Sequence, residues 1–339
     1  MLRKLAFLSA AFVVLLSASP LLSQKAATQQ EEDRPSTPAI QDLADLQLAP
    51  SRQHEFEAAL KEHDFQLAEK ILVEESEQDP HSLRSAKLLV TAGGIFFLDG
   101  KYLNSVICWK RAEAIAPLDD RTRFTLAMAY VRLNRRDWAR TELEKLVASQ
   151  PRNPLYLYWL ARLDYDAQNY TAAIEGLKKV VALDPNMMRA YDSLGLVYDY
   201  LGQSDKAIEN YNRAVELNRT QAKPSPWPHV DLAVTLIATN QLSEAENHLK
   251  EALRYDARLP QAHYQLGRLL EMRGNYRAAA EALREAAAAN PSYPEPHLLL
   301  GQIYRRTGDK RQAEAEILRF KELKAAAETH PSIPLLSPK

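Results

Sequence analysis

Cysteine and glycine are scarce in this sequence of 339 residues, and neither sign of charge is in large excess. Cys108 is the only cysteine, so the chain can form no intramolecular disulfide. Ten glycines are few for a β-rich protein or for an enzyme built on glycine-rich loops. The formal net charge of −1 gives no general indication of nucleic acid as a partner. The motifs HExxH, GxSxG and CxxC do not occur and we find no catalytic constellation, so we expect no enzyme, cofactor or metal.

Charge is distributed unevenly along the chain. Residues 31–79 carry 14 acidic and 4 basic residues, whereas residues 1–30 carry 3 basic residues and no acidic one. The rest of the chain is therefore mildly basic. An acidic start of this kind favours solubility. Orientation of a partner, or a head-to-tail contact between chains, is the alternative interpretation.

The first 23 residues are typical of a secretory signal. Arg3 and Lys4 precede an apolar run over residues 5–16, and small residues follow it. We therefore predict a signal peptide over 1–23 and an exported chain, periplasmic or secreted, with a bacterial cell envelope as the preferred setting. A membrane anchor over residues 5–22 that is not cleaved is the alternative. No cysteine follows the run, so lipoprotein attachment is not supported.

The rest of the chain divides into three parts. Residues 24–48 are polar and contain prolines, which predicts a disordered linker. Within it, apolar residues spaced by three predict a short capping helix in 38–48. Helical periodicity predicts an array over residues 49–328, and a proline-containing tail follows at 329–339.

A single pattern recurs through residues 49–328. Small residues occupy the same place in successive helix pairs, at intervals of 37, 34, 34, 34, 38, 34 and 34 residues. These residues are Ala68, Ser105, Ala139, Ala173, Ala207, Ala245, Ala279 and Ala313. Large and mostly apolar residues follow four positions later, as Leu177 and Tyr211 do. Because one helix pair cannot bury its apolar face alone, the period predicts eight stacked helix–turn–helix units.

The first helix and the end of each unit follow the same pattern. A leucine followed by a small residue, as in Leu194-Gly195, lets two helices approach closely, and a proline such as Pro151 ends the unit. Unit 1 has Glu55-Phe56 in place of the leucine–small pair, so it is degenerate. Unit 8 lacks the closing proline, so we predict that its second helix continues through the KELKAAAE segment.

These repeats resemble the tetratricopeptide repeat family. The resemblance implies an all-α, right-handed α-solenoid of about eight helix–turn–helix units, with a concave groove lined by the first helices. It implies a scaffold or adaptor that binds a protein or peptide in that groove, and not nucleic acid. An accessory subunit of an envelope enzyme, or of a secretion or pilus assembly apparatus, is the alternative. A membrane is expected as partner only if the N-terminal segment stays uncleaved, and the oligomeric state is not predicted.

The groove-facing positions of the first helices are rich in aromatic residues and arginine, the residue types that anchor interfaces. The candidate partner-binding residues are Phe97, Phe124, Met128, Tyr158, Trp159, Arg162, Tyr165, Arg189, Tyr200, Trp227, Tyr264 and Arg268. Packing between neighbouring first helices is the alternative for each of them. We predict that Trp159→Ala weakens partner binding and spares the fold. The set of lysine, asparagine and arginine with which some family members clamp acidic C-terminal peptides is not found.

Three local patterns suggest sites but are interpreted as packing. His229, His263 and His297 are 34 residues apart, and equivalent positions in adjacent units lie roughly 10 Å apart. They cannot all lie about 2.0 to 2.1 Å from one zinc ion. Residues 94–102 have the wrong spacing for a phosphate-binding loop and follow no strand. Cys108, beside a tryptophan on a predicted helix, is expected to be a buried structural thiol.

One loop is longer than the period requires. Residues 218–230 add four residues between units 5 and 6. Pro224, Pro226 and Pro228 favour a stiff, extended path. A tolerated surface insertion is one interpretation, and a hinge or partner contact between units 1–5 and units 6–8 is the other.

Overall fold

The computed structural model describes residues 46–329, which form sixteen α-helices and no strand. This confirms the predicted all-α solenoid of eight helix–turn–helix units. The helix pairs are α2 (Pro50–Lys61) and α3 (Phe65–Ser76), α4 (Leu83–Leu98) and α5 (Tyr102–Glu113), α6 (Asp120–Arg132) and α7 (Arg136–Ser149), α8 (Pro154–Asp166) and α9 (Tyr170–Leu183), α10 (Met188–Tyr200) and α11 (Ser204–Asn218), α12 (Trp227–Ala238) and α13 (Leu242–Tyr255), α14 (Pro260–Met272) and α15 (Tyr276–Ala289), α16 (Glu295–Thr307) and α17 (Lys310–Thr329). The predicted signal peptide, nearly all of the predicted linker and nearly all of the tail lie outside the described residues.

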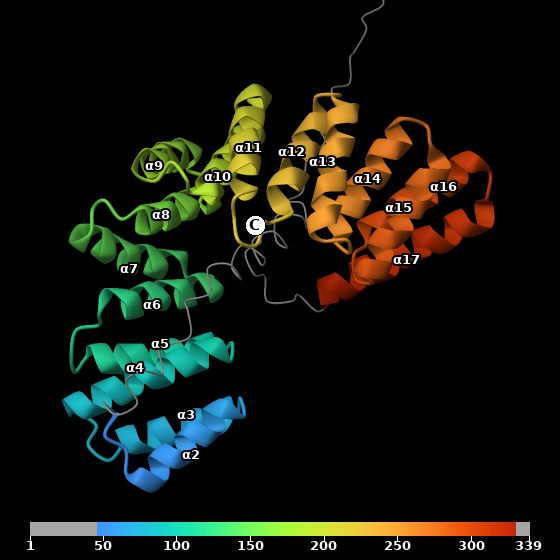
Figure 1. Ribbon diagram of the computed structural model, residues 1–339. Helices are drawn as coiled ribbons and strands as arrows, with labels where there is room; N and C mark the ends of the chain where they lie inside the picture. Colours follow the sequence, from blue (N-terminus) through green and yellow to red (C-terminus); the bar gives the residue numbers. More distant parts are fainter. Residues whose placement is uncertain (1–45, 330–339) are drawn as a thin grey trace, which may run out of the picture.

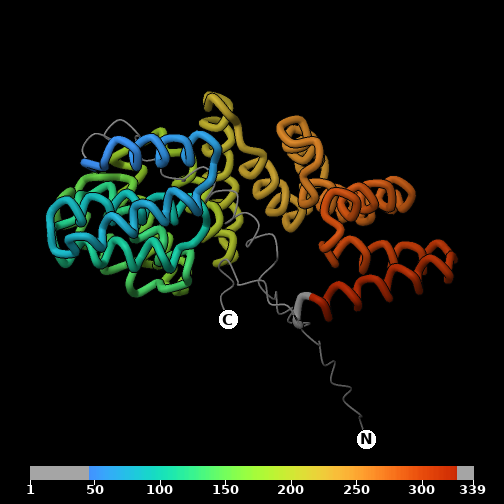
Figure 2. Tube along the Cα trace, turned by 90° about the horizontal axis from the view of Figure 1, so that it is seen from below, coloured from blue at the N-terminus to red at the C-terminus, as the bar shows by residue number. Residues whose placement is uncertain are grey.

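The eight units stack into an arch (Figure 1). Each second helix packs on the first helix of its own unit and on the first helix of the next. The stack runs from α2 and α3 to α10, turns near α11 and α12, and continues to α17. Figure 2 shows the early units on one side and α14–α17 on the other. The first helices α8, α10, α12, α14 and α16 also contact one another in sequence, so they form a continuous surface, called here the first-helix face.

Every turn between the two helices of a unit contains one residue with a left-handed backbone. The φ angle lies between 56° and 89° at all eight positions. These residues are His63, Gly100, Asn134, Gln168, Gly202, Asn240, Gly274 and Gly308. Glycine adopts this conformation without strain, whereas a residue with a long side chain, such as Gln168, does so at a cost. The repeat period therefore corresponds to a repeated turn geometry rather than to a repeated glycine.

The small residues of the pattern mark close contacts between the two helices of a unit. A Cβ atom added to Gly195 would lie 2.6 Å from the ring of Tyr211, and one added to Gly267 would lie 2.6 Å from Leu283. Ala173 is fully buried in the same way. Because protein interiors are close-packed, a larger residue at these positions would force the helices apart.

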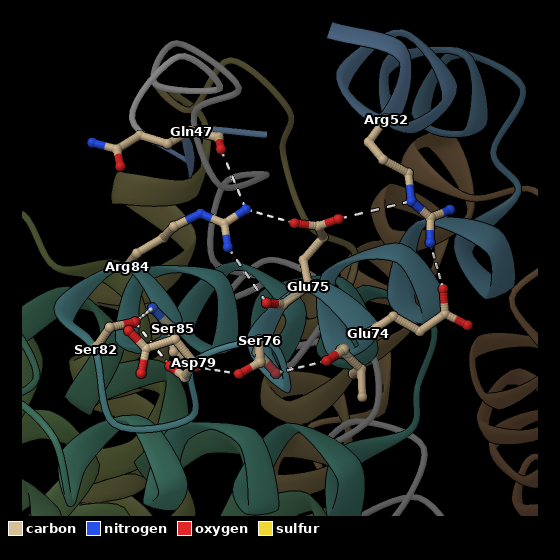
Figure 3. Close-up of polar contacts among 10 residues, drawn as sticks. Gln47, Arg52, Glu74, Glu75, Ser76, Asp79, Ser82, Arg84 and Ser85 are labelled. Carbon is tan, nitrogen blue, oxygen red and sulfur yellow. Dashed lines mark hydrogen bonds and ion pairs between the residues drawn. The ribbon is translucent and has the colours of Figure 1, made fainter. Parts of the chain in front are cut away.

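Unit 1 also departs from the pattern by burying a carboxylate. Glu75 occupies the slot that holds Ala112 in unit 2, and it is only 6% exposed. Arg84 of α4 donates a hydrogen bond to one Glu75 oxygen over 2.6 Å, and Arg52 of α2 lies 3.8 Å from the other (Figure 3). Arg84 also donates to the carbonyl of Gln47 over 3.2 Å. A buried carboxylate is costly without such partners, so an ionic network takes the place of the apolar contact and fixes residues 46–49 to units 1 and 2.

The two ends of the described array differ. Leu46 and Leu48 are buried against the core, but residues 47–49 are not helical, so the end of the predicted capping helix is wrong. Gln47 has a left-handed backbone with φ of 50°, which ends any helix before it, and Ala49 precedes Pro50, where the helical region is disfavoured. The rest of that predicted helix lies outside the described residues. At the other end α17 is 20 residues long, as predicted for unit 8.

The long loop between units 5 and 6 is held at its base. Asn218 Nδ2 donates to the Ser225 carbonyl over 2.7 Å, and the Ser225 N–H donates to Asn218 Oδ1 over 2.8 Å. Both residues are buried. Pro226 has a helical backbone with φ of −71° and ψ of −20°, and Pro228 lies in the first turn of α12, where proline is tolerated. The predicted extended path is therefore wrong at both residues. A hinge at this loop remains a prediction.

The expected thiol chemistry of Cys108 can be examined in the structure, whereas the alternative membrane anchor over residues 5–22 lies outside the described residues. Cys108 is buried, as predicted, and burial raises the pKa of its thiol to about 11. The thiol is therefore protonated at neutral pH and poorly nucleophilic. Among residues 46–329, no helix is both long enough and apolar enough to span a membrane.

Candidate binding surface

Five of the twelve candidate residues are buried, which corrects their prediction as groove residues. Phe97, Met128, Tyr158, Trp159 and Trp227 are each at most 7% exposed. The positions that face the groove also border the gap between adjacent helices, and bulky side chains fill that gap. Phe97 illustrates this, because its ring centroid lies 5.2 Å from that of Tyr102 and 6.1 Å from that of Trp109. Packing, the alternative interpretation, describes these five residues.

Phe124 and Tyr200 are separate from the other candidates. Phe124 is half-buried, and its ring lies 5.6 Å from that of Tyr156. Tyr200 is 60% exposed and stacks on Tyr170 with the ring centroids 4.6 Å apart. Tyr170 begins α9, so this pair bridges a first helix and a second helix at the turn edge of units 4 and 5.

The first of two groups on the first-helix face is called here the units 4–5 cluster. It consists of Tyr158, Arg162 and Tyr165 on α8 and Arg189 and Asp192 on α10. The Arg189 guanidinium lies 4.8 Å from the Tyr158 ring centroid, and the Arg162 guanidinium lies 5.5 Å from the Tyr165 ring centroid. The structure therefore brings together four of the predicted residues, with Arg189 covering the buried Tyr158.

The units 4–5 cluster places a buried carboxylate near its arginines. Asp192 is 1% exposed, and its Oδ1 accepts no hydrogen bond from the described residues. Burial alone would lower the pKa of Arg162, but the charges of Tyr158, Asp166, Tyr165 and Asp192 raise it further than burial lowers it. The guanidinium is therefore held in its charged form beside a buried carboxylate. Both arginines also cover aromatic faces, an arrangement that stabilises a cation by about 0.5 to 2 kcal/mol.

The second group surrounds a pocket between α14 and α16, called here the units 7–8 pocket. Its volume is about 270 Å³. The lining residues are Tyr264, Arg268, Glu271, Met272, Glu295, Leu298, Leu299 and Gln302, and all of them lie on first helices. Two of them, Tyr264 and Arg268, are predicted partner-binding residues. The pocket is thus part of the surface that the family resemblance places in the groove.

Polar groups at the units 7–8 pocket are only partly matched among the described residues. Arg268 donates to Gln265 Oε1 over 2.8 Å, and Glu271 pairs with Arg306 at 2.8 Å. Glu295 Oε2 is buried and accepts no hydrogen bond from the described part of the chain. Burial raises the pKa of the Glu295 carboxyl. The backbone N–H of Glu295 and the charge of Lys324 lower this pKa, but by less. A buried carboxylate oxygen without a donor is costly, so Glu295 lowers the stability of the fold.

Sequence reasoning missed Glu295 because it selected aromatic residues and arginine. Glu295 stands five positions before Leu300, as Arg189 stands five positions before Leu194. The sequence therefore shows that Glu295 occupies a groove-facing repeat position. The sequence does not show that one Glu295 oxygen lacks a hydrogen-bond donor, because this depends on the side chains of neighbouring helices.

The three histidines spaced by 34 residues do not converge. His229 is 1% exposed, and its Nδ1 lies 2.9 Å from Nδ1 of His248. His263 Nε2 lies 3.0 Å from a backbone carbonyl, and His297 Nδ1 lies 2.6 Å from Glu316. The predicted packing role is confirmed for the buried His229. Across residues 46–329, no group of three histidine, cysteine, aspartate or glutamate side chains is arranged to hold a metal ion.

Comparison with known proteins identifies similar repeats. Three family models described as tetratricopeptide repeat match residues 124–187 and 230–294, 189–221, and 270–327, which together are more than half of the chain. Human E3 SUMO-protein ligase RanBP2 is 36% identical over 64 residues, which are 19% of this chain. The match spans only 2% of that relative's length.

Solved structures show the same fold. A tetratricopeptide repeat protein from Parabacteroides merdae has a TM-score of 0.60 at 15% identity, with 79% of this chain and 98% of that chain covered. PilW, described as a widely conserved type IV pilus biogenesis factor, has a TM-score of 0.53 at 18% identity, with 62% and 93% covered. At these identities the likeness concerns the fold alone. With eight helix–turn–helix units and family models that match more than half of its length, the chain belongs to the tetratricopeptide repeat family.

Proposed function

We propose that the chain is a protein-binding adaptor that holds a segment of a partner protein against its first-helix face. The units 7–8 pocket carries this proposal, because it is a cavity on that face with charged, aromatic and apolar lining. The units 4–5 cluster lies on the same continuous face. The tetratricopeptide repeat fold, which is a protein-interaction scaffold, supports the same conclusion.

The dimensions favour a protein segment over a small molecule. At about 270 Å³ the pocket is below the roughly 300 to 1,000 Å³ of typical small-molecule sites. The charged groups on the face extend from α8 to α16 rather than converging on one point. An extended segment with several side chains can engage positions along such a surface, as peptides do in other grooves.

Site-specific photocrosslinking tests the proposal. A photoreactive phenylalanine analogue replaces Met272, which is 49% exposed at the pocket. A matched variant carries it at Glu285, which is exposed on the second helix α15. Irradiation in cells that naturally make the protein should crosslink a protein partner to position 272 and not to position 285. Crosslinks from position 285 alone would contradict the use of the first-helix face.

We also propose that the protein is exported to the cell envelope, with residues 1–23 as the signal. The basic start and the apolar run of these residues support the proposal. Residues 1–30 fused to a reporter that is active only outside the cytoplasm should give activity. The mature N-terminus should lie between about residues 20 and 30. An intact Met1 in the purified soluble protein would contradict cleavage, and recovery in the membrane with the segment intact would favour the anchor over 5–22.

The identity of the crosslinked protein decides between two settings. Subunits of one envelope enzyme, secretion apparatus or pilus assembly apparatus would make the chain an accessory subunit. Unrelated partners would make it a general adaptor.

A further inference from the structure

Neighbouring units are joined at the turn edge of the stack, where the first helix of each unit ends and its second helix begins. The Arg132 guanidinium at the end of α6 lies 5.8 Å from the ring centroid of Tyr102, the first residue of α5, and so joins unit 3 to unit 2. Tyr200, the last residue of α10, stacks in the same place on Tyr170, the first residue of α9. Such contacts restrain the angle between adjacent units.

Four other junctions also have a bridge near the turn edge. These bridges join units 1 and 2, units 3 and 4, units 6 and 7, and units 7 and 8, and each is an ion pair or a hydrogen bond. They are Lys101–Glu69, Arg136–Asp166, Arg273–Glu246 and Arg306–Tyr276. In every case the second helix of one unit is tied to the end of the first helix, or to the turn, of the next unit.

Among the described residues, the junction between units 5 and 6 lacks an equivalent bridge. Ser204 begins α11 and Ala238 ends α12, at the repeat positions that carry the stacked tyrosines one junction earlier. The methyl group of Ala238 can neither carry a charge, nor donate a hydrogen bond, nor stack on a ring. The nearby Lys206 donates to Gln203 of its own unit over 2.9 Å. The turn edge is therefore less restrained at this junction than at its neighbours.

The opposite edge of the same junction is held by buried groups. α11 ends and α12 begins at the long loop, where Asn218 and Ser225 are joined by two hydrogen bonds of 2.7 and 2.8 Å and are both buried. Trp227, the first residue of α12, is also buried. Breaking a buried hydrogen-bonded pair is costly, because its polar groups would be left unmatched. The junction is thus fixed at the loop edge and unbridged at the turn edge.

We propose that the junction between units 5 and 6 is a hinge, with its axis at the Asn218–Ser225 pair and its largest movement at the turn edge. α11 has 15 residues and is therefore about 22 Å long, so a tilt of about 10° moves the turn edge by roughly 4 Å. The stack changes direction at this junction, between α11 and α12 (Figure 1). Hinge movements are commonly absorbed by a few residues at the ends of such elements.

The hinge separates the two groups of the first-helix face. The units 4–5 cluster lies on α8 and α10, and the units 7–8 pocket lies between α14 and α16. A tilt at the junction therefore changes the distance between them. A partner segment that contacts both groups binds one angle better than the others and so selects it. This consequence rests on the proposed function, whereas the hinge itself does not.

Distances between spin labels on the full chain, measured by double electron–electron resonance, test the hinge. Cys108 is buried, so the labels attach to cysteines introduced at exposed positions. Labels at Glu175 and Asn247 span units 4 and 6, and labels at Thr141 and Glu209 span units 3 and 5 at the same repeat positions. The distance distribution across units 4 and 6 should be broader by about 2 Å, because its labels follow roughly half of the movement at the turn edge.

The double variant Ser204→Tyr with Ala238→Arg introduces the ring and guanidinium that join units 2 and 3. It should narrow the distribution across units 4 and 6 to the width found across units 3 and 5. Ser204→Tyr alone adds the ring without the cation and should leave that distribution broad. Labels at Ala182 and Arg254, near the loop edge of the same two helices, should give a narrower distribution because they lie closer to the axis. Circular dichroism should show that all variants are folded like the original chain.

The other outcomes overturn the proposal. Equal widths across units 4 and 6 and across units 3 and 5 would remove the hinge. An unchanged width in the double variant, or equal narrowing by Ser204→Tyr alone, would contradict the role of the missing bridge. A distribution at the loop edge as broad as the one between positions 175 and 247 would remove the axis. These measurements need no partner, and photocrosslinking at Met272 needs no movement, so the two proposals can fail separately.

Discussion

The first-helix face carries two groups of charged and aromatic residues that differ in how tightly they are packed. In the units 4–5 cluster, Arg189 covers the ring of Tyr158, and Arg162 lies beside Tyr165. In the units 7–8 pocket, a cavity of about 270 Å³ remains between α14 and α16. Each group contains one buried carboxylate oxygen, Asp192 Oδ1 or Glu295 Oε2, that accepts no hydrogen bond from the described residues. The richer aromatic signal therefore belongs to the better packed group, and the weaker signal belongs to the group with a cavity.

Aromatic residues and arginine therefore have two different structural roles on this face. Aromatic residues and arginine anchor interfaces, but they also fill the gaps between stacked helices. Burial and the presence of a cavity distinguish the two cases. On this basis we assign the units 4–5 cluster mainly to packing, and the proposed binding function is placed at the units 7–8 pocket.

The largest expected effect tests whether units 4–5 are a packed region. Trp159 is 7% exposed, so Trp159→Ala should lower the free energy of unfolding by about 3 to 5 kcal/mol, the range for removing a large aromatic from a core. The matched control is Trp138→Ala, because Trp138 is 56% exposed; it should cost roughly 1 kcal/mol or less. Urea denaturation of both variants measures the difference. Equal losses would mean that Trp159 is not a packing residue.

The second expected effect is a loss of stability at acid pH caused by His229, which lies on α12 of unit 6, between the units 4–5 cluster and the units 7–8 pocket. Burial and the neighbouring His248 lower the pKa of His229 to about 4, against about 6.5 in an unfolded chain. Glu251 opposes this shift and Arg219 adds to it. Between pH 6.5 and 4 the unfolded chain therefore binds more protons than the folded chain. The contribution of the neutral His229 to the free energy of unfolding is complete above pH 6.5 and declines towards pH 4. The free energy of unfolding should fall by about 3 kcal/mol over this range.

The contribution of His229 is isolated by comparison of variants. Denaturation at pH 7 and at pH 4 should show a smaller acid-induced loss for His229→Leu than for the original chain. His81→Leu changes an exposed histidine and should not alter the loss. An unaltered acid-induced loss in His229→Leu would assign the pH dependence to other groups.

The smallest expected effect compares the turns of the two regions. Gln168 in unit 4 and Gly274 in unit 7 have left-handed backbones with φ of 63° and 75°. Gln168→Gly should raise the free energy of unfolding by about 0.5 kcal/mol, because relief of strain exceeds the extra entropy lost by glycine. Gly274→Gln should lower it by about 1 kcal/mol. Thermal melts of both variants provide the measurement, and changes of the same sign would show that the turns are not equivalent.

Much of the fold could be predicted from the sequence because each unit repeats the same local physics. Slots such as Ala173 and Gly195 admit only small side chains, and this leaves a visible period. The degenerate unit 1 was recognisable, but the ion pairs of its buried carboxylate were not. Glu75 needs Arg52 and Arg84 from two other helices, and no local pattern shows that pairing.

The binding surface was less predictable. A position on the first-helix face can be read from the repeat, but its exposure depends on what the adjacent units place over it. Tyr158 and Trp159 occupy neighbouring positions of α8 and are both buried, whereas Tyr264 on α14 lines a pocket. The sequence therefore placed these residues on first helices but did not show which of them are buried.

The most direct test of the difference between the two regions is the sign of two stability changes in one denaturation experiment at pH 7. Arg189→Ala removes a cation from the Tyr158 ring and should lower the free energy of unfolding by about 1 kcal/mol. Glu295→Gln removes a buried charge that lacks a donor and should raise it by up to about 1 kcal/mol. Opposite signs are the result expected if Arg189 stabilises the fold through packing and Glu295 is kept at the pocket at a cost in stability. A loss of stability in Glu295→Gln as large as that in Arg189→Ala would contradict this account.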